Sequence, residues 1–284
     1  MNGDLVVLSP HLDDAVLAVG AHLARTARSG RGVQVCTAFT RGPDPATIPP
    51  RLRRFGDYAT RTAEDDRALA LLGARPRRLD LLERLWRQPP LPGLGAVFRT
   101  PTDRGALAML PALVRIVREV LAEPGTELLA PLGVGNHVDH VELTVAVALA
   151  VAETGDWSRV TFYEDYYALG EAMRRRHPVT RTRRESWRAS PGWAAPLQGA
   201  VLRGTALIAR GPGPADYLPG LWPRAEDWCC RPTPVDGFED LKLDAVAAYR
   251  SQTAALGGMP RLGRILRRAH RQRGGELLWR VVPR

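Results

Sequence analysis

The chain has 284 residues, of which 45% are hydrophobic and 25% are charged, as is usual for a soluble globular protein. No apolar run approaches the roughly 18 residues that a bilayer span requires. The first residues, MNGDLVVLSP, lack the basic start and the cleavage site of a secretory signal. Three cysteines are too few for a disulfide framework. These features predict a cytoplasmic enzyme of bacterial type.

The formal net charge is +10, and nearly all basic residues are arginines, because Lys242 is the only lysine. Basic residues cluster in segments 173–188 and 261–273. Such clusters can attract anionic substrates, nucleic acid or a membrane, but more often they are solvated faces. No zinc-finger, RNA-recognition or homeodomain pattern accompanies them. We therefore expect no nucleic-acid partner.

Strand-like and helical segments alternate through the first part of the chain, which is the pattern of βαβ units. Strands are expected at 4–10, 33–39, 77–81, 127–132 and 160–165. Helices are expected at 13–28, about 53–73, 105–123 and 138–153. Continuously apolar strands suit a sheet that is covered on both faces. The sequence therefore predicts a doubly wound, mostly parallel α/β sheet.

The pattern becomes less regular after about residue 165. A strand pair, or a strand and turn, is expected at 197–211, a helix at 237–256, and a basic amphipathic helix in the last segment. There is no internal repeat and no obvious linker. We therefore predict a single domain over 1–284, with a βα core at 1–165 and a C-terminal elaboration at 166–284.

Three polar side chains follow the first strand directly, in SPHLDDA: His11, Asp13 and Asp14. Such groups are costly to bury unless they are paired or bind a metal. The carboxyl ends of parallel strands are where α/β sheets bind ligands. A tight turn into the helix can aim His11 and Asp14 at one point, which leaves Asp13 free for another role. An N-capping Asp and a hydrogen-bonded His are the alternative interpretation.

The stretch LLAPLGVGNHVDH repeats this arrangement, with a strand, a glycine-rich turn and then His137, Asp139 and His140 entering a helix. Both clusters are expected at the same edge of the sheet. A mixed His/Asp set suits a divalent metal, most plausibly zinc, and three ligands with an open position define a catalytic site. The remaining histidines stand alone and are expected to be structural or exposed: His22, His177 and His270.

SPHLDDAVLAVGAHLA together with GVGNHVDH resembles the LmbE-like, or PIG-L, family of metal-dependent de-N-acetylases. RTAEDDRALALLGA (61–74), FYEDYYA (162–168) and KLDAVAAYRSQ (242–252) resemble later landmarks of that family. The resemblance implies a Rossmann-like fold and removal of acetyl groups from N-acetylglucosamine conjugates. Some members hydrolyse other amides or tailor antibiotics.

By position, the resemblance implies that His11, Asp14 and His140 bind one zinc per chain, although another divalent metal could occupy a similar site. It implies that Asp13 is the general base on the attacking water. His137 would steady the oxyanion or protonate the departing amine. The resemblance also implies that Arg61 contacts the sugar. We expect Asp139 to contact the metal ligands without binding the metal itself.

Two positions depart from the family pattern, since Leu12 stands in place of Pro and Ala15 in place of Glu. Leu12 supplies no ligand atom, whereas Ala15 removes a side chain that follows a ligand. The metal ligands implied by the resemblance are therefore unaffected, whereas the family's substrate can be inferred less directly for this sequence. The substrate contacts are expected in the irregular segments 83–105 and 167–196, with these side chains as candidates: Trp86, Arg87, Arg99 and Trp187.

Three other functions remain open. The first is hydrolysis of a different amide, such as a thiol conjugate or an acylated natural product. The second is a metal phosphoesterase, although such enzymes favour two metals and the sequence offers ligands for one. The third is a non-catalytic member of the fold that binds anionic ligands. The sequence leaves the substrate and the oligomeric state undetermined.

Overall fold

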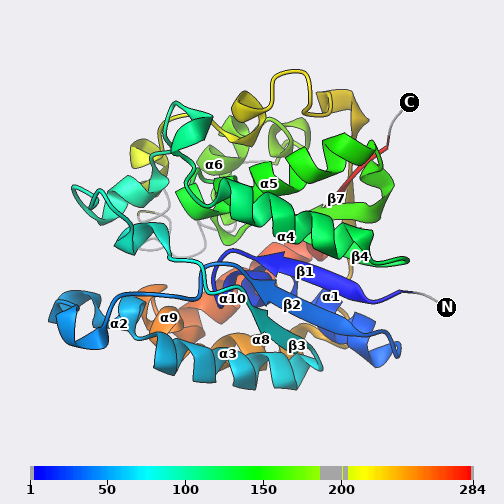
Figure 1. The fold of residues 1–284 in the computed structure, drawn as a ribbon. Helices are drawn as coiled ribbons and strands as arrows, with labels where there is room; N and C mark the ends of the chain where they lie inside the picture. The colour runs from blue at the N-terminus through cyan, green and yellow to red at the C-terminus, as the bar shows by residue number, and fades with distance from the viewer. Residues whose placement is uncertain (1–2, 186–199, 201–203, 283–284) are drawn as a thin grey trace.

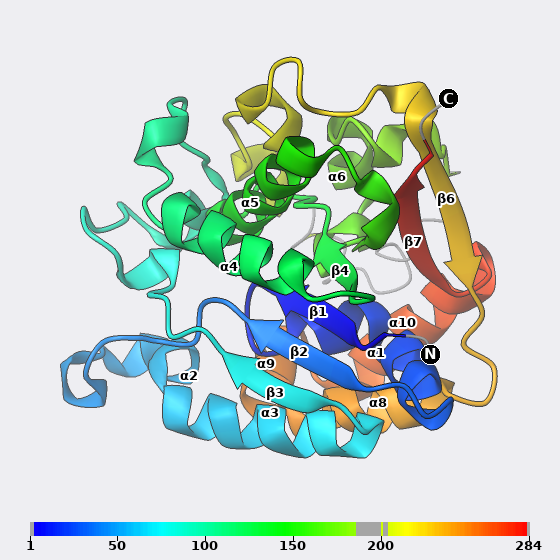
Figure 2. The same ribbon diagram turned by 45° about the vertical axis from the view of Figure 1, so that its right-hand side comes forward.

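In the computed structural model, which describes residues 3–185, 200 and 204–282, the apolar strands pair into one sheet. The strand order is β3-β2-β1-β4-β5-β7-β6, and Figure 2 shows β3, β2, β1 and β4 side by side. The described strands are β1 (Leu5–Ser9), β2 (Val33–Thr37), β3 (Arg75–Arg78), β4 (Glu127–Pro131), β5 (Val160–Tyr163), β6 (Trp228–Thr233) and β7 (Glu276–Val281). The first five run parallel, and β7 is antiparallel to β5 and β6. The predicted mostly parallel α/β fold is confirmed.

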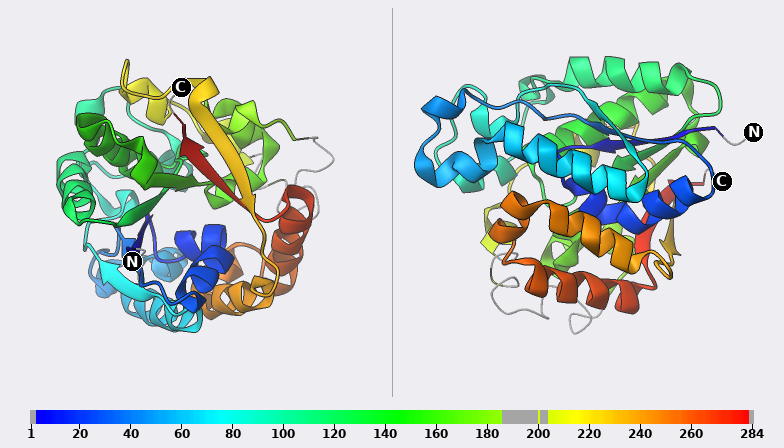
Figure 3. Two further views of the ribbon diagram at one scale, coloured as in Figure 1. Left: turned by 90° about the vertical axis from the view of Figure 1, so that its right-hand side faces the viewer. Right: turned by 90° about the horizontal axis from the view of Figure 1, so that it is seen from below.

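Helices cover both faces of this sheet, as the apolar strands require (Figures 1 and 3). One face carries α4 (Leu110–Ala122) and α5 (Val138–Thr154). The other carries α1 (Asp14–Arg28), α3 (Tyr58–Leu72), α8 (Glu239–Ala248) and α10 (Met259–Arg273). Three shorter helices are α2 (Arg53–Gly56), α6 (Glu171–Arg176) and α9 (Arg250–Ala255). Each face has its own hydrophobic core.

Two of the expected helices are divided. The helix expected at 53–73 ends at Gly56 and begins again at Tyr58, because the Asp57 carboxylate accepts the Thr60 N–H at 3.0 Å and caps α3. The helix expected at 237–256 is interrupted at Tyr249, whose hydroxyl donates to Asp65 Oδ1 at 2.8 Å. The Tyr249 hydrogen bond ties the junction of α8 and α9 to α3.

The second half of the chain differs from expectation in two places. Residues 204–208 are helical rather than extended, and Arg210 makes only an isolated bridge to Arg99; 197–199 and 201–203 lie outside the described residues. The strands β6 and β7 were not expected at all, and they extend the same sheet that the first five strands form. Residues 166–284 thus complete the sheet as well as covering it.

The sheet has a topological switch point between β1 and β4. From β1 the chain moves outward through β2 to β3, and it then returns to place β4 on the other side of β1 (Figure 2). Loops that leave neighbouring strands in opposite directions open a crevice at their carboxyl ends, where α/β proteins bind ligands. His11 and His137 follow these two strands.

None of the helices within the described ranges is both long enough and apolar enough to span a membrane.

Candidate metal centre and active-site cavity

The turn after β1 is shaped by Ser9, whose hydroxyl donates to the His11 carbonyl at 2.6 Å and accepts the Ala15 N–H at 3.1 Å. The His11 backbone N–H donates to Asp14 Oδ2 at 2.9 Å. The His11 ring then lies with Nδ1 3.0 Å from the same oxygen. The turn therefore aims His11 and Asp14 at one point, as their spacing predicted.

The turn after β4 uses backbone conformations with positive φ at Gly133, Gly135 and Asn136. At Gly135 a side chain would also collide with Tyr167, because an added Cβ would lie 2.8 Å from its Cβ atom. His137 then caps α5, where its Nδ1 accepts the Asp139 N–H at 3.3 Å. This turn carries His140 to the first turn of α5, with Nε2 3.2 Å from Asp14 Oδ2.

One oxygen, Asp14 Oδ2, thus lies next to a ring nitrogen of both His11 and His140. Each histidine uses its other nitrogen for an outer carboxylate. His11 Nε2 contacts Asp139 Oδ2 at 3.1 Å, and His140 Nδ1 contacts Asp165 Oδ1 at 2.6 Å. Histidines that bind metals are typically oriented by a carboxylate in this way.

The donor set fits a divalent metal. His140 Nε2 is fully buried, and it makes no hydrogen bond to any residue that the structure describes. Ring nitrogens of His11, His137 and His140 lie within 4.8 Å of one another, which is close enough to share one ion. A buried ring nitrogen whose nearest polar neighbour is a carboxylate oxygen is an arrangement that suits two ligands of one metal ion.

A second group, His11 with Glu83 and Asp139, is equally compact. Its carboxylates already have cationic or hydrogen-bonding partners. Glu83 Oε2 accepts from Arg61 Nη1 at 3.2 Å, and Asp139 pairs with Arg87 and accepts the Arg84 N–H at 3.0 Å. We therefore assign no metal to this group.

The buried histidines differ in protonation because of the charges around them. Burial opposes the charged form of His140, but Asp14 and Asp165 outweigh it and raise its pKa to about 9. The same balance, with Glu83, Asp139 and Asp14 as the anions, raises the pKa of His11 well above its usual value. Burial and the neighbouring His11 and His140 hold the pKa of His137 well below its usual value. The neutral form of His137 is therefore favoured, whereas His11 and His140 would have to give up a proton to bind a metal.

Asp13 lies apart from these contacts and lines the adjoining cavity. Burial and the neighbouring Asp14 raise its pKa to about 6, while Arg61 and His11 act in the opposite direction. Its carboxylate is thus a poised proton acceptor near neutral pH.

The cavity has a volume of about 430 Å³, and most of the site residues predicted from the sequence line it. His11, Asp13, Asp14, Arg61 and His137 all line it, whereas His140 and Asp139 are wholly buried behind it. Arg61 is only 4% exposed, and its guanidinium also donates to the Phe55 carbonyl at 2.8 Å and lies over the Tyr58 ring. The cavity places these groups within reach of one ligand.

The other suggested substrate contacts are placed differently. Arg87 is buried and pairs with Asp139 and Glu142, so it holds two carboxylates of α5 and does not line the cavity. Trp86 and Arg99 do not line the cavity either, and Trp187 lies outside the described residues. Segment 83–105 does contribute four apolar lining residues: Leu85, Leu94, Val97 and Phe98.

Sequence reasoning missed two carboxylates, Asp165 and Glu83. Asp165 follows β5 by two residues and reaches the site because β5 pairs with β4. The sequence could have identified Asp165, because it comes at the end of a predicted strand and so at the same edge of the sheet as the two His/Asp clusters. Glu83 has no such signal, because it reaches Arg61 only through the irregular chain after β3.

The model of the PIG-L family, described as GlcNAc-PI de-N-acetylase, matches residues 6–151, which is just over half of the chain. This chain belongs to the PIG-L family. A PIG-L relative from Streptomyces fradiae, 2'-N-acetylparomamine deacetylase, is 31% identical over 201 residues, or 70% of this chain and 69% of the relative. As a PIG-L protein, the chain is an amide hydrolase of the deacetylase type, and metal dependence is typical of the family.

Solved structures of PIG-L-like deacetylases share the fold. The A40926 pseudoaglycone deacetylase has a TM-score of 0.64 at 22% identity, and covers 99% of this chain and 98% of its own. A teicoplanin-pathway deacetylase, described in a zinc-inhibited form, has a TM-score of 0.66 at 21% identity, and each chain is covered to 98%. These likenesses agree with a PIG-L fold over nearly the whole chain.

Proposed function

We propose that this protein is a zinc-dependent hydrolase that removes the N-acetyl group from an N-acetylglucosamine-type amino sugar conjugate. The observation that carries the proposal is the convergence of His11, Asp14 and His140, with Asp13 and His137 beside them on one cavity. His11, Asp14 and His140 would hold one zinc ion. When bound, zinc polarises an amide carbonyl and lowers the pKa of water toward about 7.

Asp13 supplies the general base. Its carboxylate accepts a proton from the attacking water, whose oxygen bonds to the carbonyl carbon of the amide. The pKa of Asp13, raised to about 6, leaves the side chain ionised at neutral pH yet able to hold that proton. Arg61, close enough to lower this pKa, would orient the sugar.

His137 supplies a hydrogen-bond donor. Since its Nδ1 accepts the Asp139 N–H, the hydrogen of the neutral ring is assigned to Nε2. That N–H can donate a hydrogen bond to the oxyanion of the tetrahedral intermediate. The proton that Asp13 accepted from the water then passes to the leaving nitrogen, because protonation of that nitrogen by His137 would need the cationic ring, which burial and the neighbouring His11 and His140 oppose. When the C–N bond breaks, the nitrogen leaves as a free amine and the acyl group leaves as acetate.

The proposed function is tested by amine release from a panel of acetylated amines. The panel contains N-acetylglucosamine, its glycosides, and an N-acetylated amine that lacks a sugar. We expect release from the amino sugars and little from the sugar-free amide, with chelation abolishing both. Release from the sugar-free amide alone would contradict the sugar assignment and favour the alternative, hydrolysis of another amide such as a natural product.

A further inference from the structure

Arg87 follows the short helix η3 (Arg84–Trp86) directly and is buried, although the proposed reaction gives it no role. Its guanidinium is held in three directions. Nε donates to the Leu82 carbonyl at 2.7 Å, and Nη1 donates to Glu142 Oε2 at 2.7 Å. Its Cζ atom lies over the Phe39 ring, 4.8 Å from the ring centre. A planar guanidinium that is fixed in this way keeps one orientation.

The remaining nitrogen of Arg87, Nη2, pairs with Asp139 Oδ1. Asp139 is wholly buried, so its carboxylate is costly unless donors surround it. The Arg84 N–H donates to Asp139 Oδ2 at 3.0 Å, and the same oxygen lies 3.1 Å from His11 Nε2. Arg87 thus binds one oxygen of Asp139 and leaves the other directed at His11.

This arrangement determines which nitrogen of His11 carries a hydrogen. An ionised carboxylate only accepts hydrogen bonds, so Asp139 Oδ2 requires the hydrogen on His11 Nε2. In the neutral ring the lone pair then belongs to Nδ1, which lies 3.0 Å from Asp14 Oδ2. His11 needs that lone pair to bind a metal together with Asp14.

We infer that Arg87 is a positioning residue for the metal centre: by fixing Asp139, it holds His11 in the orientation and tautomer that bind zinc. Arg87 does not line the cavity, so it acts through Asp139 and not on the substrate. This inference rests on the proposed function, because it concerns the same zinc site.

Zinc affinity tests the inference, measured by competition with a chelator and without substrate. Arg87→Gln should lower the affinity by about tenfold and Asp139→Asn by about 10–100-fold, because both weaken the support of His11. Since Arg87 acts through Asp139, Arg87→Gln should have little further effect in a chain that already carries Asp139→Asn. Fully additive losses in the double variant would overturn the inference.

The matched control is Glu142→Gln, which weakens the other ion pair of Arg87 and leaves Asp139 intact. Urea unfolding of the zinc-free protein should show lower stability for both Arg87→Gln and Glu142→Gln. Only Arg87→Gln should lose zinc affinity. A similar loss of affinity in Glu142→Gln would mean that Arg87 stabilises the fold and does not position His11.

Arg87→Lys separates charge from orientation, and it carries the comparison where Arg87→Gln fails to fold. Lysine keeps the positive charge, but its single ammonium group cannot reproduce the fork that holds Asp139 and Glu142 together. We expect its zinc affinity to stay below that of the wild type. Wild-type affinity in Arg87→Lys would overturn the inference, because charge alone would then suffice.

These outcomes are distinct from those of the amine-release assay. Zinc affinities in the expected order, without amine release from any substrate, would support the role of Arg87 and contradict the proposed function. Equal zinc affinities in the wild type and all variants would overturn this inference even if N-acetylglucosamine is hydrolysed. A wild type that binds no zinc would overturn both.

Discussion

At the scale of single residues, the site depends on one carboxylate oxygen. Asp14 Oδ2 contacts a ring nitrogen of His11 at 3.0 Å and of His140 at 3.2 Å. The pKa of Asp14 is held well below its usual range, since the two histidines outweigh the effect of burial. Asp14 is therefore anionic, which the proposed role as a metal ligand requires.

Substitution of the neighbouring residue, Asp13, tests catalysis separately from metal binding. Asp13→Asn should keep the zinc content of the wild type, because the ligand positions are intact. It should lower amine release by about 10²–10⁴-fold, because the base is removed. Elemental analysis and the amine assay on one preparation check both. Near-wild-type turnover in this variant would show that Asp13 is not the base.

Asp165 should raise the affinity of the site for zinc through its contact with His140, without binding the zinc itself. Asp165→Asn keeps the size of the side chain but weakens the hold on His140 Nδ1, so zinc affinity should fall by about 10–100-fold. Competition with a chelator measures this affinity. Asp44→Asn, at an exposed loop position, is the control and should leave affinity unchanged. Equal zinc affinity in the two variants would refute the supporting role of Asp165.

The two His/Asp clusters were predictable because each follows an apolar strand and enters a helix. Their meeting point followed from the parallel order of β1 and β4. Arg87 could not be placed in this way, because it lies in an irregular segment where no periodicity defines a side chain's direction. Its burial between Asp139 and Glu142 is a tertiary outcome.

At the scale of elements, α1 contains a break at Val19, where φ is −132° and ψ is 23°. The Glu276 carboxylate of β7 accepts the Ala21 and His22 N–H groups at 2.9 and 2.8 Å, and so caps the second half of α1. Lys242 donates to the Ala18 carbonyl at 3.2 Å. These two side chains satisfy the backbone groups that the break releases.

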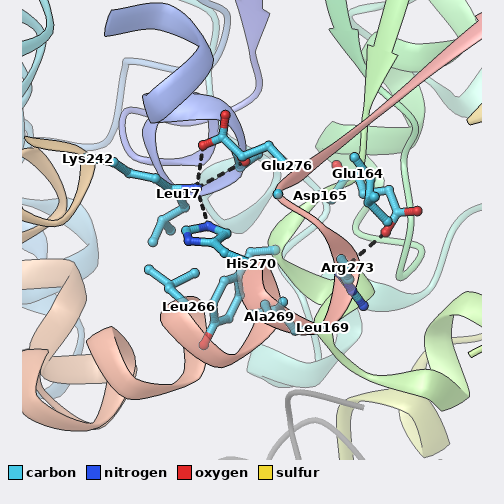
Figure 4. A pocket seen from close by; sticks show the side chains of 14 residues that line it. Leu17, Glu164, Asp165, Leu169, Lys242, Leu266, Ala269, His270, Arg273 and Glu276 are labelled. Carbon is cyan, nitrogen blue, oxygen red and sulfur yellow. Dashed lines mark hydrogen bonds and ion pairs between the residues drawn. The ribbon is translucent and has the colours of Figure 1, made fainter. Parts of the chain in front are cut away.

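Figure 4 shows how Lys242, Glu276 and His270 point toward one another behind α1. Lys242 Nζ lies 2.8 Å from Glu276 Oε1, and both side chains are 1% exposed. Gly20 is required there, because an added Cβ would lie 2.9 Å from Lys242 Cγ. Lys242, the only lysine of the chain, therefore has a structural role.

Lys242→Met should leave Glu276 buried without its cation and lower the free energy of unfolding by about 3–5 kcal/mol. Urea unfolding measures the change. Arg118→Met, which breaks the exposed Arg118–Glu153 pair, is the matched control and should have little effect. Similar losses in the two variants would contradict the buried pair as a major stabilising contact.

Strands β1, β2, β4 and β5 could be predicted from continuous apolar runs. β6 and β7 could not, because WCCRPT and ELLWRV mix polar and apolar residues and pair with each other across the segment 234–275, which contains three helices. The break in α1 was also hidden, since VLAVGAHLA keeps a helical pattern across it. The break is explained only by the tertiary contacts of Lys242 and Glu276 with the backbone of α1.

At the scale of the whole molecule, buried neutral histidines make stability depend on pH. Burial, together with Arg174 and Arg181, lowers the pKa of His177 to about 3, and burial and Lys242 lower that of His270 to about 3. In the unfolded chain both titrate near 6.5. Below that pH the unfolded state binds protons that the folded state does not, so stability falls as the pH decreases.

His177→Gln isolates one of these groups. Its amide can still donate to the Leu132 carbonyl, which His177 Nε2 contacts at 3.0 Å. Between pH 6.5 and 5 the wild type should lose about 1.4 kcal/mol of stability per pH unit through His177, and the variant should lose that much less. Urea unfolding at pH 7.5, 6 and 5 gives the slopes. Parallel slopes would mean that His177 is not neutral in the fold.

We propose above that His11, Asp14 and His140 hold the metal of an amide hydrolase. The most direct measurement is zinc content and N-acetylglucosamine turnover for the wild type, before and after chelation, and for His140→Ala. We expect about one zinc per chain, turnover that is lost on chelation and restored by zinc, and little zinc in His140→Ala. Full zinc occupancy in His140→Ala, or turnover that survives complete chelation, would contradict it.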